Sequence, residues 1–357
     1  MPTPTLTISL PALSANYRLL KSRHANHTIA AVVKADAYGL GMQAIAGHLW
    51  QEGQRDFFVA TLAEGITLRE TLPEAKIGVF NGLLAGEEKE YQHYQLIPVL
   101  NDLGQVERFA RMTDDGWQMT SIIHIDTGMT RLGLSESDLK KIRHPSSVIR
   151  HLMSHLACAS HPTHAKNAEQ LSRFREALKH FPGATASLAN SSGLFLPPDF
   201  HFDIARPGCA LYGINPTKGP NPMQQVARLT APILQIRTLD RDETVGYDAT
   251  YKAKKGSRIA IVALGYADGW PRNLSNKGSA YIANHKVPIM GIISMDMLAL
   301  DVTTIPDAEL SKATEAEFLN ASQTVDDIAR ECGTIGYEIF TGIGNRVQRI
   351  YSETQTD

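Results

Sequence analysis

Short apolar runs alternate with amphipathic segments along the first 212 residues or so of the chain. Several of the amphipathic segments have apolar residues at helical spacing, as at residues 10–23, 42–53 and 164–181. The apolar runs have the length of strands and number eight, at residues 28–34, 57–62, 77–82, 96–100, 121–127, 148–156, 186–190 and 202–208. Eight strand-helix repeats predict a (β/α)8 barrel, a TIM-like α/β fold.

The pattern changes after Pro216. The following stretches are rich in β-forming residues and separated by turn residues, and residues 321–333 are the one clearly helical segment among them. The length of 357 residues also exceeds the roughly 250 to 300 residues at which single cores stop growing. We therefore expect two domains, a barrel at residues 1–225 and a mainly β domain at residues 226–357.

Composition narrows the class of protein. The chain has 35 Lys and Arg against 37 Asp and Glu, and the basic residues form no long run, so nucleic acid and anionic membranes are not expected partners. Its N-terminus lacks the features of a signal peptide, and no apolar stretch approaches the roughly 20 residues of a membrane span. Three scattered cysteines form neither a disulfide framework nor a zinc motif, which predicts a cytoplasmic protein: Cys158, Cys209 and Cys332.

A single lysine, Lys34, ends the apolar run in AVVKADAYGLG. A desolvated lysine has a lowered pKa and can attack a carbonyl to form a Schiff base, although a lysine at a strand end can also simply extend its amine to water. His155, Asn190 and Arg206 end later runs, and the barrel fold brings strand ends to one mouth. The sequence therefore predicts a site at that mouth.

Eight motifs in sequence order are similar to those of the alanine racemases. They span both expected domains: VVKADAYGLG (32–41), DTGMTRLG (126–133), LMSHLA (152–157), ANSSG (189–193), RPGCALYG (206–213), VGYDATYKA (245–253), GYADGWPR (265–272) and ISMDM (293–297). The resemblance implies that Lys34 carries pyridoxal 5'-phosphate (PLP), and it implies no metal. The four histidines in HLMSHLACASHPTH complete no familiar ligand pattern either.

The resemblance also implies the two bases that racemisation needs, one on each face of the substrate Cα. Lys34 acts on the D enantiomer and Tyr247 on the L enantiomer. A tyrosine titrates near pH 10, so it needs cationic neighbours to act as a base. In this family the tyrosine reaches the active site of the opposite subunit, which implies a homodimer with shared sites. Without the resemblance, the sequence favours a strand tyrosine with its hydroxyl at the surface as the interpretation of Tyr247.

Further roles follow from the same resemblance. Arg206 faces the pyridine nitrogen of the cofactor and leaves it unprotonated. His155 orients Arg206 and Tyr247. Without the resemblance, Arg206 could equally be a structural ion-pair residue. The phosphate cradle comprises Tyr38, Asn190, Ser191 and the main chain at Gly208 and Cys209. The ANSSG segment alone is equally typical of a helix-capping loop.

The expected substrate contacts come from both domains. Arg131 offers a planar fork to the substrate carboxylate, and Met295 contributes its backbone N–H. Tyr266 and Asp296 line an entrance whose small size favours the short side chain of alanine.

The sequence departs from the family pattern at several positions. His124 stands where relatives commonly have a lysine, often carbamylated, that brings negative charge to the arginine at position 131; a neutral imidazole cannot replace that charge. The remaining departures are Ile292 in the entrance, Asn345 near the phosphate, and Ser160 and His161 after the HLACA stretch.

The resemblance therefore predicts a PLP-dependent racemase that interconverts L-alanine and D-alanine and supplies D-alanine for peptidoglycan. A broader amino-acid racemase on the same scaffold is the first alternative. A non-catalytic PLP carrier is an alternative of another class, although such proteins are typically shorter and lack the β domain. A decarboxylase of related fold is a further one.

Overall fold

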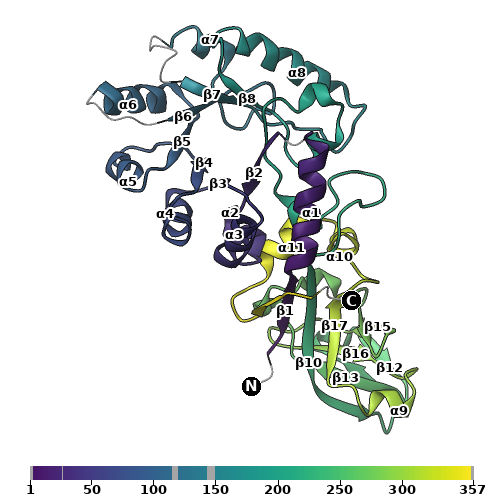
Figure 1. Ribbon diagram of the computed structural model, residues 1–357. Coiled ribbons are helices and arrows are strands. Elements are labelled where there is room, and N and C mark those ends of the chain that lie inside the picture. The colour runs from purple at the N-terminus through teal and green to yellow at the C-terminus, as the bar shows by residue number, and fades with distance from the viewer. Residues whose placement is uncertain (1–2, 26, 115–119, 143–148, 355–357) are drawn as a thin grey trace. The chain divides into compact units, whose positions relative to one another are not determined.

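The protein divides into two compact units in the computed structural model (Figure 1). One unit is Leu13–Gln224, and the other combines Met1–Ala12 with Gln225–Asp357. Helix α1 (Leu10–Arg23) leads the chain from the second unit into the first. The structure describes residues 3–25, 27–114, 120–142 and 149–354.

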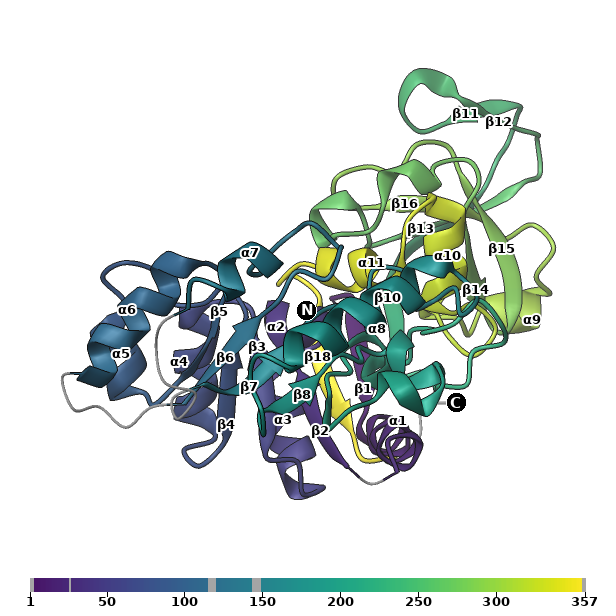
Figure 2. The same cartoon turned by 90° about the horizontal axis from the view of Figure 1, so that it is seen from above.

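The first unit is built on eight parallel strands in the order β8, β7, β6, β5, β4, β3, β2, β9 (Figure 2). The ring closes between β9 and β8, where the N–H groups of Asp203 and Arg206 donate to the carbonyls of Ala186 and Ala189. The predicted TIM-like barrel is therefore confirmed, with one strand within each predicted run or shifted from it by a single residue. The strands are β2 (Thr28–Val32), β3 (Asp56–Val59), β4 (Lys76–Val79), β5 (Ile97–Leu100), β6 (Ser121–His124), β7 (Ile149–Met153), β8 (Thr185–Ser187) and β9 (Ile204–Ala205).

Helices cover the outside of this barrel and bury part of their surface against it. In α3 the buried residues Met42, Ile45, Ala46 and Leu49 recur at helical spacing and form an apolar stripe. The connecting helices are α2 (Lys34–Gly39), α3 (Met42–Gln51), α4 (Leu62–Thr71), α5 (Glu88–His93), α6 (Leu103–Asp114), α7 (Glu136–Leu139) and α8 (Ala165–Leu178).

The barrel interior holds one apolar layer. Its buried members come from five strands and are packed against Tyr38, Phe80, Ile97 and Ile204. Strand side chains alternate between the interior and the helices, so both faces of these parallel strands are covered. The buried members of the layer are Ala30, Val32, Phe58, Val99, Ile122 and Met153.

The second unit is a mainly antiparallel β structure, as expected for the C-terminal part of the chain. Strand β10 pairs with β17 on one side and with β13 on the other, which closes β13, β16, β15, β14 and β17 into a barrel. The strands are β10 (Ala227–Thr238), β11 (Glu243–Val245), β12 (Tyr251–Ala253), β13 (Arg258–Val262), β14 (Ser279–Ile282), β15 (His285–Met290), β16 (Leu298–Asp301), β17 (Glu315–Leu319) and β18 (Gln348–Ser352).

The first residues of the chain belong to this β unit, in contrast to the expected domain of residues 1–225. Strand β1 (Thr5–Ser9) pairs antiparallel with β10 and parallel with β18. Leu6 and Ile8 are fully buried in that position. A short N-terminal strand gives no sequence signal for the strands it will pair with, because both partners lie more than 200 residues away.

Three helices accompany the β unit: α9 (Asp307–Leu310), α10 (Val325–Cys332) and α11 (Gly336–Gly342). The expected helix at residues 321–333 corresponds to α10, which Thr324 and Asp327 cap reciprocally. Among the residues that the structure describes, no helix has the length and apolar character to cross a membrane.

Candidate functional site

The sequence-predicted residues of the first unit gather at the carboxyl ends of its strands. Lys34 follows β2, His155 follows β7, and Arg206 follows β9. The strands are parallel, so these ends share one mouth. Asn190 forms a bridge with Arg206 across the closing seam of the barrel, which brings the predicted cradle to the same rim.

The chain leaves Lys34 in a left-handed turn. Ala35, Asp36, Ala37 and Tyr38 have φ angles between 51° and 60°. None of them is glycine, so each costs about 1 to 2 kcal/mol relative to a right-handed conformation. Such a run persists only where the surroundings hold it in place.

Glu64 supplies much of that support. Its Oε1 accepts the N–H of Ala35 at 2.7 Å, and its Oε2 accepts the N–H groups of Ala60 at 2.7 Å and Thr61 at 3.2 Å. One carboxylate on α4 thus joins the turn after Lys34 to the end of β3. Sequence reasoning missed this residue, although Thr61 and Glu64 have the spacing of a capping box.

The Lys34 amine lies in an environment that disfavours its protonation. Burial is the main cause that lowers the pKa of Lys34, and the charge of Arg131 lowers it further, whereas Glu64 raises it. The amine also lies 5.8 Å from the ring centroid of Phe80. Lys34 is therefore a better nucleophile and base than an exposed lysine.

Arg206 is buried, with 2% of its surface exposed. Its Nη1 donates to Ser187 Oγ and its Nη2 to the carbonyl of Ser154 at 2.5 Å. Burial lowers the pKa of Arg206 to about 9. Its Nε has no hydrogen-bond partner within the described residues, so one buried donor is left for an acceptor from outside the chain.

Two histidines beside these cations are held neutral. Burial and the charges of Arg206 and Arg131 lower the pKa of His155 well below its ordinary value. The same causes lower the pKa of His124 to about 4. His124 Nδ1 donates to Asn101 Oδ1 at 2.8 Å, so Asn101 fixes the tautomer.

The predicted cradle residues lie against one another at the same mouth. Ser191 Oγ accepts the N–H of Gly208 at 2.9 Å and of Ala210 at 3.3 Å, which leaves the hydroxyl proton available to donate. A Cβ at Gly208 would lie 2.4 Å from the Tyr38 hydroxyl, so only glycine fits. Burial, followed by Cys209, raises the pKa of Tyr38, which keeps its phenol protonated. Asn190 Nδ2 lies 3.4 Å from His155 Nε2.

Arg131 is exposed in a loop shaped by Asp126. Asp126 Oδ1 accepts the N–H groups of Gly128, Met129 and Thr130 at 2.8 to 3.0 Å. These bonds contribute to lowering the pKa of Asp126. The guanidinium of Arg131 therefore comes from a loop with a defined backbone, although its own tip is accessible.

The other predicted residues belong to the β unit. Tyr247 begins a 3₁₀ turn between β11 and β12, and its side chain is 65% exposed. Tyr266 and Met295 are also exposed, and they lie on adjoining segments because the N–H groups of Tyr266 and Ala267 donate to the carbonyls of Ser294 and Met295. The Tyr266 and Met295 segments are thus joined by two backbone hydrogen bonds.

Arg346 was not expected from the sequence. Its Nη1 donates to Asp296 at 2.7 Å, and its Nε lies 3.1 Å from the carboxylate of buried Asp268. Asp268 in turn accepts the N–H of Gly265 at 2.8 Å. One arginine near the C-terminus therefore positions Asp296 and the segment that contains Tyr266.

Comparison with known proteins identifies the family to which both units belong. The family profile described as "Alanine racemase, N-terminal domain" matches residues 8–216, and "Alanine racemase, C-terminal domain" matches residues 226–351. This chain belongs to the alanine racemase family. Both halves of the family are present in order, as the eight motifs predicted.

Individual members of the alanine racemase family are similar over nearly their whole length. The alanine racemase of Acidiphilium cryptum is 46% identical over 353 residues, which cover 97% of this chain and 98% of that protein. The catabolic alanine racemase of Agrobacterium fabrum is 42% identical, with 97% and 91% covered. The crystal structure of alanine racemase from Bartonella henselae with covalently bound pyridoxal phosphate has a TM-score of 0.93 and 38% identity and covers 99% of this chain and 100% of that one.

Within this alanine racemase fold, Glu64→Gln tests the support of the left-handed turn. An amide retains one acceptor in place of two carboxylate oxygens, so at least one of the three N–H groups loses its bond. We expect a loss of about 1 to 3 kcal/mol in local stability. Hydrogen exchange of a peptide covering residues 34–41 measures it, and the exposed Glu74→Gln is the control. Equal exchange in both variants would contradict the role of Glu64.

The neutral state of His124 predicts a pH effect. The folded pKa of about 4 lies below the ordinary value of 6.5, so the unfolded chain takes up the proton first as the pH falls. The contribution of His124 to the free energy of unfolding is complete above pH 6.5. It declines by about 3 kcal/mol as the pH falls towards 4.

Urea unfolding at a series of pH values measures this effect. His124→Asn should show a smaller loss of stability between pH 6.5 and 4 than the unaltered protein, whereas the exposed His93→Asn should not. A pH dependence that is unchanged in His124→Asn would exclude a buried neutral imidazole.

Proposed function

We propose that this protein interconverts L-alanine and D-alanine with PLP bound to Lys34. Its membership of the alanine racemase family across both units supports this function, and the similarity to the Bartonella henselae enzyme supports the cofactor. The structural observation that carries the proposal is the Lys34 amine, whose pKa is lowered by burial at the barrel mouth beside Arg131.

The residues at the mouth fit PLP. The unpartnered Nε of Arg206 is a buried donor that suits an aromatic nitrogen, which accepts one hydrogen bond. Because an arginine is purely a donor, it stabilises the unprotonated form of that nitrogen. His155 is adjacent, and its low pKa prevents a second positive charge next to Arg206.

A phosphate group fits the predicted cradle at this mouth. Ser191 can donate its hydroxyl proton, and protonated Tyr38 can donate its own. Asn190 and the main chain at Gly208 and Cys209 complete this proposed cradle. Three cations, Lys34, Arg131 and Arg206, act on the same region and favour an anionic ligand there.

Bound PLP acidifies the substrate Cα proton by withdrawing electrons from that carbon. We assign the proton transfers to two side chains. In the D-to-L direction Lys34 removes the Cα proton, and Tyr247 donates a proton to the opposite face. In the L-to-D direction Tyr247 removes the Cα proton, and Lys34 donates one to its own face.

Substrate binding in this proposal uses both units. Arg131 pairs with the substrate carboxylate through its planar fork, and the backbone N–H of Met295 donates to the same group. Tyr266 and Asp296 line the entrance, with Asp296 held by Arg346. Tyr247 and Met295 would come from the partner subunit of a homodimer, so each active site would contain residues of both chains.

The physiological role we propose is the supply of D-alanine for peptidoglycan. The family also includes an enzyme described as catabolic, from Agrobacterium fabrum. Growth of a deletion strain separates the two roles, because a biosynthetic enzyme makes growth depend on added D-alanine, whereas a catabolic enzyme affects growth on alanine as carbon source.

The two bases are tested by α-hydrogen exchange in D₂O, starting separately from each enantiomer. Tyr247→Phe should lose exchange from L-alanine, and Lys34→Ala exchange from D-alanine, each by about 10²- to 10⁴-fold. Tyr281→Phe in β14 is the matched control for loss of a hydroxyl. Borohydride reduction and peptide mapping should locate PLP on Lys34, a result that does not depend on turnover. Unchanged exchange in Tyr247→Phe would remove it as a base.

Shared sites are tested by mixing the two inactive variants. If Tyr247 serves the partner subunit, a mixed dimer of Lys34→Ala and Tyr247→Phe has one intact site and one site with both defects. Random mixing should then restore roughly a quarter of the unaltered activity, since half of the dimers are mixed. If Tyr247 acts within its own chain, every site keeps one defect and no activity returns.

A further inference from the structure

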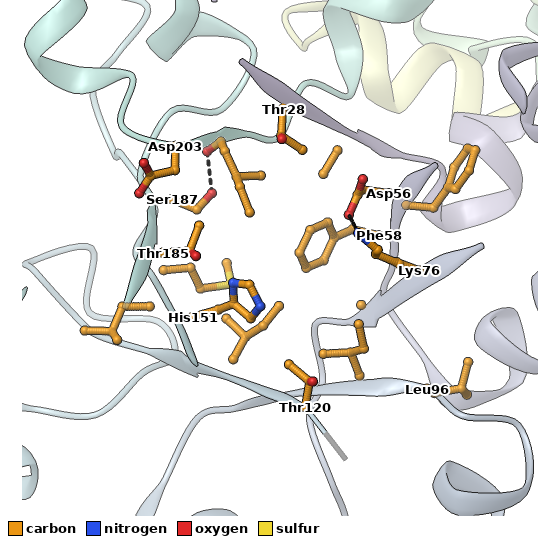
Figure 3. A pocket seen from close by; sticks show the side chains of 18 of the residues that line it. Thr28, Asp56, Phe58, Lys76, Leu96, Thr120, His151, Thr185, Ser187 and Asp203 are labelled. Carbon is orange, nitrogen blue, oxygen red and sulfur yellow. Dashed lines mark hydrogen bonds and ion pairs between the residues drawn. The ribbon is translucent and has the colours of Figure 1, made fainter. Parts of the chain in front are cut away.

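A cavity of about 770 Å³ lies in the barrel at the end opposite to Lys34. Thr28 lines it at the start of β2, whereas Lys34 follows the end of that strand. Figure 3 shows labelled side chains of several strands, among them Asp56, Lys76 and His151, arranged around an open centre. None of the residues that we assign to the racemase reaction is among the residues that line this cavity.

The cavity exists because the side chains at this end of the barrel are small. Thr28, Gly78, Thr185 and Ser187 occupy inward positions where a TIM barrel usually has bulky branched residues. The Phe58 ring occupies the space beside Gly78, since a Cβ at position 78 would lie 2.3 Å from that ring. The volume falls within the range of small-molecule pockets, about 300 to 1,000 Å³.

The floor of the cavity is apolar. Phe58, Ile122 and Met153, which line it, also belong to the apolar layer of the barrel interior. Phe58 stacks on Phe80 with ring centroids 4.8 Å apart, which fixes the orientation of its ring. A ligand that enters from the amino-terminal end therefore meets an ordered hydrophobic surface at the bottom.

Two rim charges of opposite sign, Asp56 and Lys76, have unused bonding capacity, whereas a second carboxylate, Asp203, accepts the N–H of Ala186 at 2.8 Å. The Lys76 ammonium lies 3.8 Å from the Asp56 carboxylate, which is too far for a hydrogen bond. In the part of the chain that the structure describes, no donor bonds to the Asp56 side chain and no other acceptor meets Lys76 Nζ. Burial raises the pKa of Asp56, as expected for a carboxylate without donors.

We propose that this cavity binds a small zwitterion with an apolar body, an α-amino acid with a large apolar side chain. The ammonium group of the ligand bonds to Asp56, its carboxylate bonds to Lys76, and its side chain covers Phe58 and Met153. A ligand with a single charge would satisfy one member of the rim pair and oppose the other. The zwitterion matches both.

Titration calorimetry with N,N-dimethyl-L-phenylalanine tests the proposal on the PLP-loaded enzyme. This probe is a zwitterion whose tertiary amine cannot form a Schiff base, so it cannot react at the cofactor. We expect saturable binding of one molecule per chain. 3-Phenylpropionate and N,N-dimethyl-2-phenylethylamine, which each keep one charge, should bind at least about tenfold more weakly.

Lys76→Met and Asp56→Asn should each weaken binding of the probe by about tenfold or more, while the exposed-site controls Lys312→Met and Asp240→Asn should not. Lys76 is exposed, so Lys76→Met remains informative even if Asp56→Asn fails to fold. Alanine racemisation should be unchanged in Lys76→Met. Any one of four results would overturn the proposal: no saturable binding, equal binding in Lys76→Met, equal binding of a singly charged analogue, or displacement of the probe by alanine.

Discussion

The structure of the site depends on keeping the Lys34 amine at the barrel mouth with little hydration. Burial lowers its pKa, and the strand that precedes it is buried on both faces. The backbone then has to turn away at once, which it does through four left-handed residues that are not glycine. Glu64 stabilises that conformation by accepting three N–H groups. Hydrogen bonds to a side chain of the neighbouring helix α4 therefore offset the conformational free energy of the left-handed turn.

Positive charge dominates the same mouth and determines the state of its neutral groups. Arg206 and Arg131 both act on His155 and His124, and each imidazole is held in its neutral form. A histidine at position 124 therefore adds no charge, and its hydrogen bond goes to an amide oxygen of Asn101. His124 therefore does not supply Arg131 with the negative charge that the family resemblance expects from a carbamylated lysine at this position.

Much of the fold and many of the candidate residues could be predicted from the sequence, because strand runs and motif spacing are local signals. The eight barrel strands and α10 illustrate this. Glu64, Asn101 and Arg346 were missed because each acts through contacts that only the folded chain creates. Arg346, for instance, joins Asp268 and Asp296, which lie 50 or more residues before it. The cavity at the barrel end depends on the absence of bulk at several strands at once, and no single segment reveals it.

The position of β1 has a consequence for biosynthesis. Residues 5–9 are synthesised before the barrel, yet the strands beside them, β10 and β18, are made after it. The barrel is thus inserted between two pieces of the β unit, and it can close while the N-terminal strand is still without neighbours. Contacts over such long stretches of chain form slowly. The second unit therefore completes its sheet only after β18 has been synthesised and has paired with β1.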